Sequence, residues 1–164
     1  MATGQISLTL LPATRAYVST EDAIWLPCNW FECVDLDLTS EAAEYLHDGL
    51  DALLPAGEPL TRAIHIWGDD HSDNVQVLFG DKGGVEAVAV VLDPYRSSVP
   101  LIEGLCSLAC DLDCVFVTDA GAIVPPSPDC IVRAMLHPPA AQFLRDAECP
   151  VTVANVANGE GVGV

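Results

Sequence analysis

Basic side chains are scarce in this chain. One lysine and five arginines stand against 24 acidic residues among 164, for a formal net charge of −18. Nucleic-acid binding requires a basic surface, and anionic membranes attract basic segments, so we expect neither partner. A clamp for phosphate or nucleotide would also lack the arginines and lysines that usually form it.

Membrane spans and sorting sequences are missing as well. No apolar run approaches the roughly 20 residues that cross a bilayer. The start, MATGQISLTLLPATRAYVSTEDA, has no basic region before its short apolar run, so we expect no secretory leader. The chain has seven cysteines, an odd number, and no Asn-x-Ser/Thr acceptor. This pattern is typical of reduced thiols, and we expect a cytoplasmic protein whose cysteines are mostly small core residues.

The sequence also lacks the common motifs of catalysis. It contains no G-x-S-x-G, G-x-G-x-x-G, G-x-x-x-x-G-K-[ST] or H-E-x-x-H. Cys106, Cys110 and Cys114 lie among leucines on a predicted helix and the following strand, which favours buried thiols over metal ligands. None of the four histidines suggests a nucleophile–base pair. We therefore expect no enzymatic activity and no cofactor.

The hydrophobic patterning is that of a folded domain, since 51% of the residues are hydrophobic and 18% are charged. Alternating apolar residues predict strands at 5–11, 31–39, 62–67, 74–80, 85–93 and 114–118, and a short strand within 119–126. Helical spacing and capping residues predict helices within 39–57, 97–113, 127–137 and 138–148. We expect an α+β fold, a mostly antiparallel sheet with about three helices packed on one face. We assign 1–150 to a single domain and 151–164 to a partly flexible C-terminal tail.

The acidic residues are concentrated in one stretch. Between Arg15 and Arg62 there are ten acids and no lysine or arginine. Within the helix predicted at 39–57, one set of acids steps by 3, 4 and 3 residues: Glu41, Glu44, Asp48 and Asp51. Its apolar residues follow the same steps two positions later, on the opposite face: Ala43, Leu46, Leu50 and Leu53. The strand predicted at 31–39 adds Asp35 and Asp37 on its polar side.

This stretch suggests a docking surface for a basic protein. Like charges three and four residues apart repel, and a purely solvated helix usually mixes in lysine. Trp25 and Trp30 lie just upstream and, if exposed, would serve as aromatic anchors. The alternative is a solvated acidic face without a partner, which keeps the protein soluble.

The stretch HIWGDDHSD, residues 65–73, is a second candidate site. Histidine and aspartate are ligand types for zinc, manganese or calcium, so a metal-binding protein or metal-dependent enzyme is the alternative function. Its ligands would be His65, Asp69, Asp70, His71 and Asp73. The spacing matches no defined coordination loop, and Gly, Asp, Ser and Asn are what a turn between two strands requires. We favour the structural turn.

A resemblance to a protein class rests on several short segments between residues 62 and 147. They are W-G-D-D-x-x-D-x-V-x-V, LIEGLCSLACDLDCVFV, G-A-I-V-P-P-S and AAQFLRD. Together they resemble small uncharacterised bacterial α+β proteins of immunity-protein type. The resemblance implies a non-enzymatic bacterial inhibitor that docks on a basic toxin, and it carries over no catalytic residue. A structural oligomeric subunit, such as a homodimer, is a further alternative.

Overall fold

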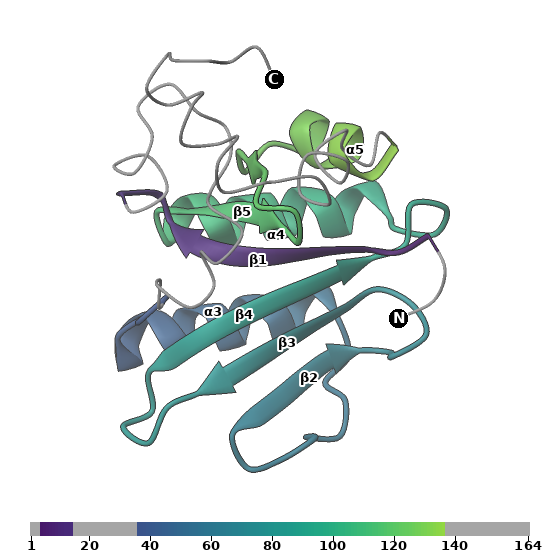
Figure 1. The fold of residues 1–164 in the computed structure, drawn as a ribbon. Coiled ribbons are helices and arrows are strands. Elements are labelled where there is room, and N and C mark those ends of the chain that lie inside the picture. The colour runs from purple at the N-terminus through teal and green to yellow at the C-terminus, as the bar shows by residue number, and fades with distance from the viewer. Residues whose placement is uncertain (1–3, 15–35, 137–164) are drawn as a thin grey trace.

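The computed structural model describes residues 4–14 and 36–136, which form one antiparallel sheet and three helices (Figure 1). The fold is therefore α+β, as the hydrophobic pattern predicts. The helices are α3 (Ser40–Leu53), α4 (Val99–Asp111) and α5 (Pro128–Leu136). The strands are β1 (Ile6–Pro12), β2 (Ile64–Gly68), β3 (Asn74–Phe79), β4 (Val85–Leu92), β5 (Cys114–Thr118) and β6 (Ile123–Val124).

The first strand of the chain lies inside the sheet. The strand order is β2-β3-β4-β1-β5-β6, and every neighbouring pair is antiparallel. Since β4 and β5 both pair with β1, they run parallel to each other, and such a pair needs a long crossover connection. Helix α4 supplies that crossover. The hairpins β2–β3 and β3–β4 build the other half of the sheet.

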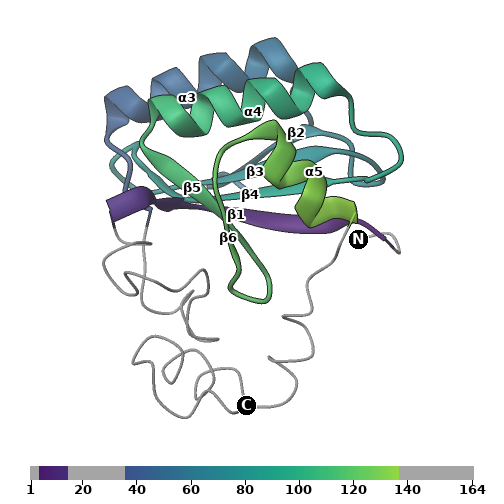
Figure 2. The ribbon, with the colours of Figure 1, turned by 90° about the horizontal axis from the view of Figure 1, so that it is seen from above.

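The helices and the sheet enclose one main core. In Figure 2, α3 and α4 lie side by side over the same face of the sheet. Each strand alternates, so β5 directs Phe116 to this core and Val115 and Val117 to a smaller cluster on the opposite face. Helix α5 packs against α4 and β6, and its buried Ile131 and Met135 join the main core.

A glycine allows α3 and α4 to approach closely. A Cβ added at Gly49 of α3 would overlap the side chain of Leu108, a buried residue of α4. Helix α3 itself begins after Thr39, whose hydroxyl accepts a hydrogen bond from the Ala42 amide at 3.3 Å. This cap and this contact fix where the acidic residues of α3 lie.

The strand predicted at 31–39 is only partly correct in the region that the structure describes. Leu38 forms an isolated antiparallel bridge with Val85, but Asp37 has φ 48°, which is incompatible with a continuous strand. The bridge uses the start of β4, because β1 pairs with β4 only from Ala89 onward. The helix predicted at 138–148 and the tail at 151–164 lie outside the described residues.

Candidate functional site

The predicted acidic face of α3 is exposed along the whole helix. Its four carboxylates all belong to exposed residues, and we call them the acidic helix face: Glu41, Glu44, Asp48 and Asp51. The apolar residues of the same helix are buried in the main core: Ala43, Leu46 and Leu50. The opposition of the two faces, predicted from their spacing, is confirmed.

Few cations balance the acidic helix face. Within the described residues, its ion pairs are those of His47, whose Nδ1 lies 3.3 Å from Asp51 Oδ2 and 3.9 Å from Asp48 Oδ1. Glu41 and Glu44 have no ion-pair partner among the same residues. Their charges therefore face solvent, where an external cation meets little competition.

Two shallow depressions flank α3. One, of about 350 Å³, we call the His47 depression, and its lining includes Glu44, His47, Asp48 and Phe79. The other, of about 460 Å³, we call the Tyr45 depression, and its lining includes Glu41, Tyr45 and Asp111. Each depression combines carboxylates with an aromatic side chain, and none of the described residues that line them is a lysine or arginine.

Tyr45 joins the two helices beside the acidic face. Its side chain is 48% exposed, and its hydroxyl donates a hydrogen bond to the Asp111 carboxylate of α4. This hydrogen bond raises the pKa of Tyr45, with smaller contributions from burial and from the Asp111 charge. The phenol thus stays protonated, and the hydrogen bond holds the ring beside the carboxylates.

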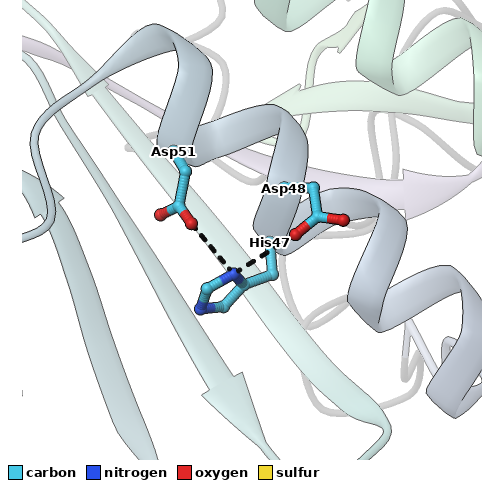
Figure 3. Close-up of side chains that lie close together, drawn as sticks. All are labelled: His47, Asp48 and Asp51. Carbon is cyan, nitrogen blue, oxygen red and sulfur yellow. Dashed lines mark ion pairs between the residues drawn. The ribbon is translucent and has the colours of Figure 1, made fainter.

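A hydrogen-bonded group connects α3 to the edge of the sheet. Figure 3 shows His47 between Asp48 and Asp51, with Asp51 one helical turn further along α3. Trp67, a buried residue of β2, donates from Nε1 to Asp51 Oδ1 at 2.7 Å. The His47 ring meets the Trp67 ring edge-on, with centroids 5.1 Å apart. Spacing alone places His47 beside the acids, but only the packing of β2 against α3 reveals the role of Trp67.

The residues of HIWGDDHSD do not gather into one group of ligands. His65 packs its ring against Phe79, with centroids 4.9 Å apart, while His71 is exposed. Asp69 accepts a hydrogen bond from the His71 amide, and Asp73 accepts from the Asp93 amide and from Ser97 Oγ. In the described ranges, the histidine, cysteine and acidic residues whose ligand atoms lie close enough to hold a metal are His47, Asp48 and Asp51. The hydrogen bonds of residues 65–73 support the turn interpretation.

The structure describes only one of the remaining residues that were predicted to bind a partner. Asp37 is exposed and lies two residues before the Thr39 cap, so the acidic surface extends past the start of α3. Asp35, Trp25 and Trp30 lie outside the described residues. Among the described residues, Tyr45 is an exposed aromatic side chain next to the acids, and the sequence did not single it out.

The thiols fit a structural role. Burial is the main cause that raises the pKa of both Cys106 and Cys114 to about 11, so both are protonated at neutral pH. Cys110 is exposed, and Cys106, Cys110, Cys114 and Cys130 are all free thiols. The prediction of core cysteines therefore holds for Cys106 and Cys114.

No protein-family model matches the chain, and no curated protein or solved structure is significantly similar to it. The resemblance to immunity-type proteins thus stays a prediction. In the region that the structure covers, no helix has the length and apolar character needed to cross a membrane.

Proposed function

We infer that this chain is a non-enzymatic acidic binding protein that docks on a basic protein through the acidic helix face. The observation that carries this proposal is the exposure of four carboxylates along one helix without a lysine or arginine paired to them. An intramolecular cation on this face would relieve the repulsion between like charges. A face kept free of such cations favours a partner that supplies them.

The depressions on both sides of α3 support a protein partner over small counterions. Each is large enough to receive the end of a lysine or arginine side chain and presents carboxylates to it. Tyr45 adds an aromatic surface beside Glu41, and arginine readily packs on such a ring. Buried aromatic and arginine contacts carry much of the affinity of protein interfaces, whereas long-range attraction mainly speeds association.

A homodimer through this same face is disfavoured. In a two-fold symmetric interface the same patch of both subunits meets, so the acidic helix face would lie against itself. Opposed carboxylates repel, and among the described residues no lysine or arginine forms an ion pair with this face to compensate. The most concrete form of the proposal is an inhibitor of immunity type, acting in the bacterial cytoplasm on a basic toxin.

The test compares two doubly substituted chains that carry the same net charge. Glu44→Lys with Asp48→Lys neutralises the acidic helix face by replacing two of its four carboxylates with cations, while Glu103→Lys with Asp129→Lys makes the same change at exposed acids of α4 and α5. Each immobilised protein is exposed to a lysate of its native host at about 0.1 M and about 1 M salt, where charges are screened beyond about 10 Å and about 3 Å. Captured proteins are identified by mass spectrometry, and their association rates are then measured with purified material.

We expect to capture a basic protein that binds the wild type and the control at low salt and is released at high salt. Its association with the face variant should be at least about tenfold slower. A partner retained equally by the face variant, or held by both variants at high salt, would contradict the proposal. Capture of proteins without a basic surface would contradict it as well.

A further inference from the structure

The group formed by His47, Asp48 and Asp51 has the donor set of a metal site. Each residue presents one ligand atom, an imidazole nitrogen or a carboxylate oxygen, and these atoms all lie within 4.8 Å of one another. His47 and Asp51 are four residues apart on α3, a spacing that places both side chains on the same face of the helix. Figure 3 shows both carboxylates lying near the same nitrogen of the imidazole, Nδ1.

One ligand of this group is held from outside the helix. The indole of Trp67, which is 1% exposed, donates to Asp51 Oδ1 at 2.7 Å, so Oδ2 is the oxygen directed at His47. The same indole packs edge-on against the His47 ring. Hydrogen bonds from a second layer of residues orient ligands in metal sites and raise metal affinity about 10–100-fold. A buried donor of β2 thus orients two of the three ligands before any metal arrives.

The group also has an open side. His47 and Asp48 line the His47 depression, of about 350 Å³, and the Glu44 carboxylate lines it too. A metal held by three protein atoms therefore has room for water or for the Glu44 carboxylate as a fourth ligand. The surrounding acidic helix face adds an electrostatic attraction for a cation.

We propose that His47, Asp48 and Asp51 bind one divalent transition-metal ion of the zinc type. The ligands are His47 Nδ1 and one oxygen from each carboxylate, and water from the depression completes the coordination. An imidazole ligand favours zinc, cobalt, nickel or copper over calcium and magnesium, which take oxygen ligands and, for calcium, six to eight of them. The site differs from the one suggested by residues 65–73, because it lies on α3 and contains none of those residues.

The test is a titration of the untagged full-length protein with Zn²⁺, followed by calorimetry at about 0.15 M salt. Two variants remove ligands: His47→Ala, and Asp51→Asn, whose amide oxygen can still accept from Trp67. Two matched controls change the same residue types elsewhere: His71→Ala on an exposed turn, and Glu41→Gln on the same helix. We expect one Zn²⁺ per chain, with a dissociation constant that rises about tenfold or more in the first pair and stays close to wild type in the controls.

A second readout uses Trp67 itself. In a chain with Trp25→Phe and Trp30→Phe, Trp67 is the remaining tryptophan, and Cu²⁺ bound beside it quenches its fluorescence. Zn²⁺ should reverse the quenching by competition, and Ca²⁺ or Mg²⁺ should not. The proposal is overturned if neither metal binds saturably up to about 1 mM, if the controls weaken binding as much as His47→Ala, or if Ca²⁺ competes as well as Zn²⁺.

Discussion

At the scale of single residues, Asp73 shows how a polar cluster that resembles a catalytic site can be structural. Its carboxylate accepts from the Asp93 amide at 2.8 Å and from Ser97 Oγ at 2.5 Å. These bonds tie the turn before β3 to the segment between β4 and α4. The crossover helix α4 therefore starts from a point that is anchored to the opposite half of the sheet.

We expect Asp73→Ala to lower the free energy of unfolding by about 1.5–3 kcal/mol, since it removes a charged acceptor and leaves a backbone donor without a partner. Its exposed neighbour supplies the control, and Asp70→Ala should stay within about 0.5 kcal/mol of wild type. Urea denaturation of both variants checks this. Equal stabilities for the two variants would show that the Asp73 contacts do not hold the turn in place.

His47 is the residue for which sequence and structure differ most in what they suggest. The sequence places it beside the acids, and its i, i+4 relation to Asp51 was available as a sign of pairing. Its contact with Trp67 could not be predicted from the sequence, because Trp67 belongs to another element 20 residues later in the chain. Tyr45 was missed for the same reason, since its partner Asp111 lies on α4.

At the scale of elements, helix α3 could be predicted in detail. The opposed apolar and acidic faces follow from residue spacing, and the structure begins the helix after a capping threonine and ends it before Pro55. The strand predicted at 31–39 was less accurate. Leu36 and Leu38 are buried or half-buried and Asp37 is exposed, but a left-handed residue at Asp37 interrupts the extended backbone.

The contact between α3 and α4 predicts that a Gly→Ala substitution, which usually stabilises a helix, is destabilising at Gly49. At an exposed helical position, Gly→Ala stabilises a helix by about 1 kcal/mol. At Gly49 the added methyl group would overlap Leu108, and overpacking typically costs about 1–3 kcal/mol. We therefore expect Gly49→Ala to destabilise the wild type by about 1 kcal/mol.

In a Leu108→Ala background the overlap is removed, and the same Gly49→Ala substitution should become stabilising. Thermal or urea denaturation of the four proteins in this double-mutant cycle measures the coupling. A Gly49→Ala effect of the same sign and size in both backgrounds would mean that the helices do not meet at this point.

At the scale of the whole molecule, charge works against stability. The chain has a net charge of −18, and the described residues contain three ion pairs, two of which share His47. Self-repulsion of a highly charged surface destabilises the compact state, and salt screens it. The folded protein should consequently become more stable as salt is added.

We expect the midpoint of thermal unfolding to rise between about 0.01 M and about 0.5 M KCl, with the steepest change at the low end of the range. Glu44→Lys with Asp48→Lys should raise stability at low salt and reduce the dependence on salt, because the pairs 41/44 and 48/51 become attractive while the pair 44/48 stays repulsive. Scanning calorimetry of both proteins tests this. A midpoint that is independent of salt, or that falls in the variant, would show that the acidic helix face is already balanced within the molecule.

This prediction has the opposite sign to the one for binding. Neutralisation of the acidic helix face should stabilise the fold and slow association with a basic partner. The acidic surface lowers the stability of the fold, and its substitution weakens only the binding of a partner. This combination is consistent with selection for an interaction. The two measurements together separate the proposed function from a face that merely keeps the protein in solution.

The sequence by itself determined the features that depend on neighbours along the chain. The alternating strands, the amphipathic α3 and the α+β class follow from periodicities of two and 3.6 residues, since backbone geometry sets which side chains share a face. The placement of the acids on one side of α3 belongs to the same category.

Only the tertiary structure decided which distant residues meet. Long-range pairing puts β1 between β4 and β5, brings Trp67 of β2 under His47 and Asp51 of α3, and ties Asp73 to Ser97. These contacts depend on strand order and helix packing, which local spacing does not specify. The three ligands proposed on α3 come together through the spacing of that helix, but the hydrogen bond that orients Asp51 exists only because Trp67 of β2 lies against it.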